Sequence, residues 1–161
     1  MPLTPQLLRA LQDIVGPAGL VISAEGRLTY ECDMHTFYKG IPDAVVLPES
    51  AAQVAAIVRL CRREHVPIVP RGSGTGLIGG AMAPEGGVMV SMTRMNRIVE
   101  LDFPNRCATV QPGLINLWLS QATRSAAISS RPIPPARWCP PSAGMPRPMR
   151  GGRTASSTGS P

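Results

Sequence analysis

A glycine-rich segment that follows a short apolar run restricts the fold of this chain more than any other feature. Residues 66–69 read Val-Pro-Ile-Val and are followed by Pro70 and Arg71, so we predict a buried strand that ends at a turn. Glycine loses more backbone entropy on folding than any other residue. A glycine cluster after a strand therefore indicates positive φ angles or a ligand that approaches the backbone closely. Residues 72–80 contain five glycines, namely Gly72, Gly74, Gly76, Gly79 and Gly80.

Such a loop is suited to binding an anion. Successive exposed backbone N–H groups form a concave site, and phosphate is a common anion in such sites. Arg71 adds a cation, which we expect at the rim. A flexible surface loop is the alternative, but flexible linkers are Gly/Ser tracts that lack apolar residues such as Leu77 and Ile78. We therefore predict a diphosphate-binding loop.

Two common phosphate-binding patterns fit this loop poorly. A Walker A loop needs a lysine after its last glycine, whereas the only lysine of this chain is Lys39. Residues 74–79 match the spacing of a Rossmann fingerprint, but that fingerprint must open a helix so that the pyrophosphate meets the helix N-terminus. The glycines and Pro84 that follow disfavour a helix. A non-catalytic Rossmann-type nucleotide-binding module remains the alternative interpretation.

A longer pattern covers residues 1–122. Leu47-Pro48-Glu49-Ser50, a predicted helix, the segment 66–81 and Val110-Gln111-Pro112-Gly113 follow one another in this order. In order and spacing they resemble the N-terminal half of the FAD-binding domain of the vanillyl-alcohol-oxidase/PCMH superfamily. The resemblance is greatest to the branch that contains the glycolate oxidase FAD subunit and D-lactate dehydrogenase.

The resemblance implies an incomplete α+β, PCMH-type domain, in which a small parallel β-α-β subdomain leads into the start of an antiparallel one. It implies FAD as the cofactor, a small 2-hydroxy acid such as glycolate or D-lactate as the substrate, and partner subunits of an oxidase complex. No catalytic residue is carried over, because the family's substrate-binding and acid–base residues lie beyond the resembling part. The implied cofactor-binding residues are Pro70, Arg71, Gly72, Ser73, Gly74, Thr75, Gly76, Leu77 and Gly79 on the loop, with Gln111, Pro112 and Gly113 at the cofactor's edge.

The remaining periodicities predict the elements around the loop. Thr4 can cap a helix over residues 5–15, and Ser50 with Gln53 can form a capping box for a helix over residues 51–64. We expect Val54, Ile57, Val58 and Cys61 to form the apolar stripe of the second helix. Buried strands are predicted at 43–47 and 88–92, a β-hairpin at 98–102 and 107–111, and an amphipathic helix carrying Trp118 at 114–122.

The net charge of +6 does not come from the predicted domain. Residues 1–122 carry ten basic and ten acidic side chains, whereas residues 123–161 carry six arginines and no acid, together with eight of the eighteen prolines. We therefore predict a disordered Pro/Arg/Ser-rich tail from residue 123. A tail that binds nucleic acid is a further alternative, which we do not favour, and we expect no nucleic-acid partner.

The tail has a second interpretation. When the codons of Pro132–Met145 are read from their third bases, they permit the peptide D-P-S-S-Q-M-V-S-S-I-G-G-N-A. The family continues with a segment resembling D-P-S-S-Q followed by S-I-G-G-N-A. We hypothesise that residues after Ala122 are translated in a shifted frame.

Other residues indicate little chemistry. The four cysteines lie at scattered positions, and His35 and His65 have no matching ligand set, so we predict neither a disulfide framework nor a metal site. We find no signal peptide and no apolar run long enough to span a bilayer, and we expect a cytoplasmic protein. The expected function is FAD binding within an oxidoreductase of small 2-hydroxy acids, with this truncated chain inactive by itself.

Overall fold

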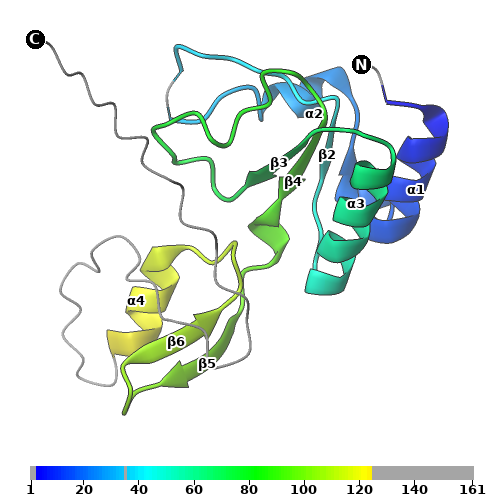
Figure 1. Ribbon diagram of the computed structural model, residues 1–161. Helices are drawn as coiled ribbons and strands as arrows, with labels where there is room; N and C mark the ends of the chain where they lie inside the picture. Colours follow the sequence, from blue (N-terminus) through cyan, green and yellow to red (C-terminus); the bar gives the residue numbers. More distant parts are fainter. Residues whose placement is uncertain (1–2, 35, 125–161) are drawn as a thin grey trace, which may run out of the picture. The chain divides into compact units, whose positions relative to one another are not determined.

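The computed structural model describes residues 3–34 and 36–124 and has the predicted α+β character (Figure 1). The predicted tail from residue 123 lies outside the described residues, except for Thr123 and Arg124, which end the last helix. The elements are α1 (Pro5–Val15), η1 (Pro17–Gly19), β1 (Leu20–Val21), α2 (Ala24–Leu28), β2 (Ala44–Val46), α3 (Ala51–Arg63), β3 (Ile68–Arg71), β4 (Val88–Ser91), η2 (Met92–Arg94), β5 (Ile98–Asp102), β6 (Cys107–Val110) and α4 (Asn116–Arg124).

A four-stranded sheet has the order β1-β2-β4-β3. β2 and β3 are both parallel to β4, which confirms the predicted parallel β-α-β arrangement, although β4 lies between the two strands. β3 begins two residues later than predicted. The chain first turns at His65, whose φ is 54°, and Val66 N donates to Cys61 O at the end of α3.

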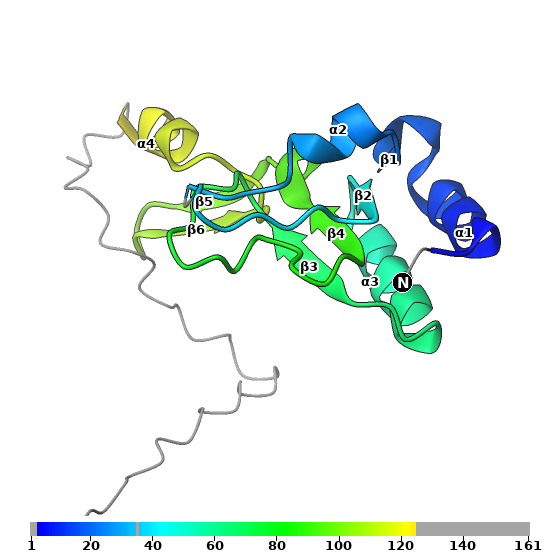
Figure 2. The same cartoon turned by 90° about the horizontal axis from the view of Figure 1, so that it is seen from above.

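Alternating residues of the strands build two apolar layers. Figures 1 and 2 show α1 and α3 on the same side of the sheet, where Val46, Val88 and Val90 point. On the opposite side, Val45 and Met89 pack with Ala83 and with parts of the long loops before β2 and β4. The first layer consists of Leu7, Leu11, Val46, Ile57, Leu60, Cys61, Val88 and Val90. The glycine-rich segment is thus joined to a packed sheet.

The helix α3 differs from the predicted stripe at one position. Ile57 and Cys61 are buried as expected, but Leu60 is buried in place of Val58, which is 42% exposed. Residues 57, 60 and 61 share one face at helical spacing, whereas position 58 is rotated by about 100° from position 57. The predicted stripe was therefore wrong at Val58.

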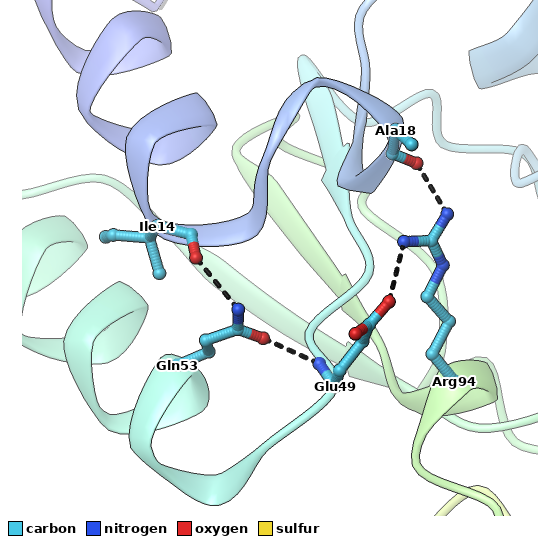
Figure 3. A network of polar contacts seen from close by, with 5 residues as sticks. All are labelled: Ile14, Ala18, Glu49, Gln53 and Arg94. Carbon is cyan, nitrogen blue, oxygen red and sulfur yellow. Dashed lines mark hydrogen bonds and ion pairs between the residues drawn. The ribbon is translucent and has the colours of Figure 1, made fainter.

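A polar network connects α1 and α3 with the short helices η1 and η2 (Figure 3). Gln53 Nε2 donates to Ile14 O at 2.9 Å, and Gln53 Oε1 accepts from Glu49 N at 2.7 Å. Arg94, at the end of η2, binds Glu49 Oε1 at 3.2 Å and Ala18 O at 2.6 Å. The predicted cap is present, because the Ser50 hydroxyl accepts from Gln53 N. The Gln53 side chain, however, reaches the N–H of residue 49 rather than that of residue 50.

The predicted hairpin is confirmed as the antiparallel pair β5–β6, with a register irregularity between Ile98 and Glu100. The helix α4 begins at Asn116, two residues later than predicted. No residue of this helix is buried in the described chain, and Trp118 is 44% exposed. The apolar side of α4 therefore contributes no buried core within the described residues.

Candidate functional site

The glycine-rich loop leaves the carboxyl end of β3 and runs to the start of β4 as bends and turns without a helix. Ligands commonly bind at this end of parallel strands in open α/β sheets. A Rossmann fingerprint at 74–79 would require a helix that begins there. The structure therefore does not favour the Rossmann-type alternative.

Three carbonyl groups of the loop and of the residues directly after it accept hydrogen bonds. Gly76 O accepts from Met34 N at 3.3 Å, Gly79 O accepts from Met82 N at 3.2 Å, and Ala81 O accepts from Arg71 Nη1 at 3.1 Å. Within the described residues, by contrast, the backbone N–H groups of residues 73–78 donate no hydrogen bond. A row of backbone N–H groups without acceptors attracts an anion.

The glycines of the loop fall into two kinds. Gly74 and Gly79 have φ of +75° each, and a methyl group at Gly74 would lie 2.7 Å from Cζ of Arg71. Gly72 and Gly80 have ordinary φ values, and a methyl group there would meet no atom within 4 Å. The conformation of the loop therefore requires glycine at positions 74 and 79. At positions 72 and 80, the absence of a side chain leaves open space beside the backbone.

Arg71 does not stand at the rim as expected. It is 9% exposed, and its guanidinium lies beneath the loop at Gly74 and donates to Ala81 O. Its Cζ is 5.6 Å from the centre of the Tyr30 ring, within the range of a cation–π contact. Arg71 is the last residue of β3, where its side chain is directed inward, so its charge supports the loop from below.

Sequence reasoning missed Asp33. This carboxylate is 6% exposed, and its Oδ2 accepts from Gly79 N at 2.9 Å. The same oxygen lies 3.8 Å from the place where a Cβ of Gly76 would stand. No local signal indicates this contact, because Asp33 and Gly79 are 46 residues apart and meet only through the packing of two loops.

The exposed side of the loop carries two hydroxyl groups. Ser73 Oγ and Thr75 Oγ1 lie 3.3 Å apart, and both residues are exposed. Pro70 and Leu77 are also exposed, while Gly79 is half-buried. Most of the predicted loop residues are thus exposed to solvent.

The second predicted group, Gln111–Gly113, is held by other partners. Gln111 N donates to Arg97 O at 2.9 Å, and Gln111 Oε1 accepts from Arg97 N at 3.0 Å. Gly113 N donates to Met95 O at 2.8 Å, and a Cβ at Gly113 would lie 2.7 Å from the carbonyl carbon of Met92. Only glycine permits this close approach of two backbones. These contacts fix the segment against the chain after β4 rather than against the glycine loop.

An apolar hollow of about 560 Å³ lies on the side of α3. It is lined by α3 residues including Val54 and Val58, by Met92 and Met95, and by Pro112 of the second predicted group. Its lining is apolar apart from Arg59, so it is less suited to a phosphate group than the glycine loop is.

Lys39, in the segment before β2, is paired with a carboxylate. Lys39 Nζ lies 2.7 Å from Glu31 Oε1, and this hydrogen-bonded carboxylate raises the pKa of Lys39 above its ordinary value.

In the described part of the chain, no group of three or more His, Cys, Asp or Glu residues could hold a metal ion. No helix among residues 3–34 and 36–124 is long and apolar enough to cross a membrane.

A family model described as an FAD binding domain matches residues 42–143. This chain belongs to the FAD-binding domain family. The match contains β2, α3, the glycine loop and the hairpin, and it continues past the boundary predicted at residue 122 into residues outside the described part. The resemblance stated from the sequence, the PCMH-type α+β fold and FAD as the family's cofactor are thereby confirmed.

Three relatives illustrate the similarity of this FAD-binding domain to known proteins. It is 39% identical over 132 residues to glycolate oxidase subunit GlcD of Bacillus subtilis (strain 168), covering 82% of this chain and 28% of the relative. It is 33% identical over 132 residues to D-lactate dehydrogenase of Anaerostipes hadrus, covering 81% of this chain and 28% of that relative. A solved structure of alkyldihydroxyacetonephosphate synthase matches with a TM-score of 0.67 and 25% identity, covering 77% of this chain and 27% of that one.

The chain therefore spans little more than a quarter of the length of these relatives. It contains the FAD-binding domain of glycolate oxidase- and D-lactate dehydrogenase-like flavoenzymes. The residues of the loop fit the pyrophosphate of FAD, because they combine unbonded N–H groups, two hydroxyls and a buried guanidinium.

Proposed function

We propose that this chain binds FAD by its pyrophosphate at residues 70–79, as part of a flavoenzyme that oxidises small 2-hydroxy acids of the glycolate or D-lactate type. The observation that carries the proposal is the row of N–H groups at residues 73–78, which donate to no described residue at the carboxyl end of β3. The substrate class rests on the names of the relatives, glycolate oxidase subunit and D-lactate dehydrogenase.

Each predicted residue has a part in this proposal. The N–H groups of 73–78 and the hydroxyls of Ser73 and Thr75 would bind phosphate oxygens, with the charge of Arg71 below them. Pro70, Gly72 and the glycines that follow would shape the loop, and Gln111–Gly113 would line the edge of the cofactor. Bound FAD supplies the electron-accepting chemistry, and the protein supplies binding and orientation.

We also propose that the 161-residue chain does not oxidise 2-hydroxy acids by itself. The described residues offer no catalytic acid–base group that we can assign, and the chain spans 28% of two relatives. One of those relatives is named as a subunit, which supports the proposal that the domain acts together with further polypeptide.

The purified chain provides the test. Titration with FAD, followed by flavin fluorescence and by the thermal unfolding midpoint, is expected to show saturable binding that FMN, with its single phosphate, does not reproduce. NAD is the control for the Rossmann-type alternative, and protection by NAD without protection by FAD would contradict the proposal. Turnover of glycolate or D-lactate with a dye acceptor by this chain alone would refute the proposed inactivity.

The shifted reading frame after Ala122 is a separate proposal, supported by the consecutive fit of Pro132–Met145 to the family's peptide. Sequencing the gene tests it, because the codons used must spell that peptide in the shifted frame. Binding of nucleic acid that is lost when residues 123–161 are removed would instead support the basic-tail alternative.

A further inference from the structure

The segment from Tyr30 to Met34 touches the glycine loop at three places. The Tyr30 ring packs on the guanidinium of Arg71, and Met34 N donates to Gly76 O. Between them, Asp33 Oδ2 accepts from Gly79 N. The green loop and the light-blue-to-cyan segment before β2 accordingly run side by side in Figures 1 and 2. This segment therefore determines how the loop is held against the sheet.

Two buried charged side chains of opposite sign hold the second half of the loop, at Gly79 and Ala81. Arg71 binds the carbonyl oxygen of Ala81, and Asp33 binds the N–H of Gly79. Each also lies beside one glycine in the first half of the loop, Arg71 at Gly74 and Asp33 at Gly76. The carboxylate accepts the N–H of Gly79, at the end of the glycine cluster. The N–H groups of residues 73–78 remain without a described acceptor.

We propose that Asp33 is the positioning residue of the phosphate loop: its bond to Gly79 N fixes the loop in the conformation that presents the N–H groups of residues 73–78 to an anion. This inference rests on the proposed FAD site and assigns Asp33 no contact with the cofactor. An unfixed loop would have to be ordered when the ligand binds, and the entropy lost in that ordering would weaken binding. A loop fixed in advance binds without that loss.

Asp43 provides a matched control. Its Oδ2 accepts from Gly87 N at 2.7 Å, so it is also an aspartate that binds a glycine N–H of the long β3–β4 connection. Gly87 stands directly before β4, however, beyond the row of N–H groups at 73–78. Loss of either carboxylate removes a hydrogen bond to a glycine N–H and is expected to lower stability. Only the loss at Asp33 should alter the phosphate loop.

The first experiment needs no ligand. Amide hydrogen exchange and NMR order parameters are measured on the full chain and on its Asp33→Ala and Asp43→Ala variants. In the unsubstituted chain we expect the Gly79 amide to exchange more slowly than the amides of residues 73–78. We expect order parameters of residues 72–80 to fall below about 0.6 in Asp33→Ala and to stay near the rigid value of about 0.85 in Asp43→Ala. An unprotected Gly79 amide, or unchanged loop order in Asp33→Ala, would overturn the proposal.

The second experiment uses FAD and inorganic pyrophosphate as probes. Asp33→Ala is expected to weaken both affinities by about tenfold or more. Asp33→Asn should retain most of the affinity, because its amide oxygen can still accept from Gly79 N. The asparagine variant also serves as the test if the alanine variant does not fold. Equal losses of affinity in Asp33→Ala and Asp43→Ala would show that Asp33 has only a general structural role, and would overturn the inference. If the unsubstituted chain binds neither probe, the proposed function fails, and the order parameters still decide the role of Asp33.

Discussion

The guanidinium of Arg71 lies against the α-carbon of Gly74, in the space where any side chain at position 74 would stand. A Cβ at Gly74 would be 2.7 Å from Cζ of Arg71, and the φ of Gly74 is +75°. The arginine also donates to Ala81 O across the loop, so its side chain fills the interior of the turn. The glycine and the arginine therefore depend on one another, and the conformation of the loop depends on both.

The two kinds of glycine in the loop should respond differently to a methyl group. Gly74→Ala is expected to lower the free energy of unfolding by about 1–3 kcal/mol, because alanine is strained at positive φ and would displace Arg71. Gly72→Ala should change stability by less than about 0.5 kcal/mol, since its methyl group meets no atom within 4 Å. FAD affinity should fall in both variants. Urea denaturation and FAD titration measure the two effects, and full affinity in stable Gly72→Ala would argue against close approach of a ligand at this position.

Arg71 should not be replaceable by lysine. A lysine ammonium cannot both contact the Tyr30 ring and donate to Ala81 O from the position of the guanidinium. We expect Arg71→Lys to lose about 1–3 kcal/mol of unfolding free energy through the lost bond of a charged group. Arg71→Met keeps the apolar stem without the charge. If the positive charge attracts the anion, FAD affinity should fall further in Arg71→Met than in Arg71→Lys, and the reverse order would show that the charge plays no part.

The network in Figure 3 predicts unequal effects of two neighbouring side chains. Gln53 donates to Ile14 O and accepts from Glu49 N, so Gln53→Ala removes two hydrogen bonds to backbone groups and is expected to cost about 1–3 kcal/mol. The Glu49–Arg94 ion pair is largely exposed on the Glu49 side, so Glu49→Ala should cost at most about 1 kcal/mol. Chemical denaturation of both variants at low and high salt checks this order, and a larger loss in Glu49→Ala would contradict it.

The buried thiol of Cys61 predicts a loss of stability at high pH. Burial raises the pKa of Cys61 from the ordinary 9.0 to about 11. The unfolded thiol therefore ionises at lower pH than the folded one, so its contribution is complete below about pH 9 and is lost as the pH rises towards about 11. The loss should be about 2 kcal/mol.

The control for this prediction is Cys61→Ala, which should be less stable at every pH because a packed side chain is lost, but should show a shallower decline between pH 9 and 11. Denaturation curves at each pH measure both slopes, and parallel declines in the two proteins would contradict the prediction.

The exposed Cys107 should react with a thiol reagent in the folded chain at pH 8, whereas Cys61 should react only after unfolding.

Local patterns were sufficient for most of the elements. Thr4 caps α1 and Ser50 caps α3 as expected, because a capping hydroxyl bonds to an N–H only three residues away. The β5–β6 hairpin was predictable for the same reason, since its two arms are joined by a short turn. Boundaries were less accurate: β3 and α4 each begin two residues later than predicted, where contacts at the ends of the elements outweigh periodicity.

Contacts between distant segments were not predictable in this way. The sequence shows that β2 and β3 are apolar strands, but not that β4 lies between them, because strand order depends on which edges pair after the chain has folded. The burial of Arg71 was missed for a related reason. A charged side chain at the end of a strand is expected in water, unless another segment supplies a ring and a carbonyl to receive it.

The sequence by itself determined the glycine-rich segment and its place after a strand, because these properties depend on residue type and local order. The tertiary structure alone decided which atoms hold the segment. Asp33 reaches Gly79 only because the loop before β2 and the loop before β4 pack on the same face of the sheet. A hydrogen bond across 46 residues leaves no periodic trace in the sequence, since its geometry exists only after both loops have been placed.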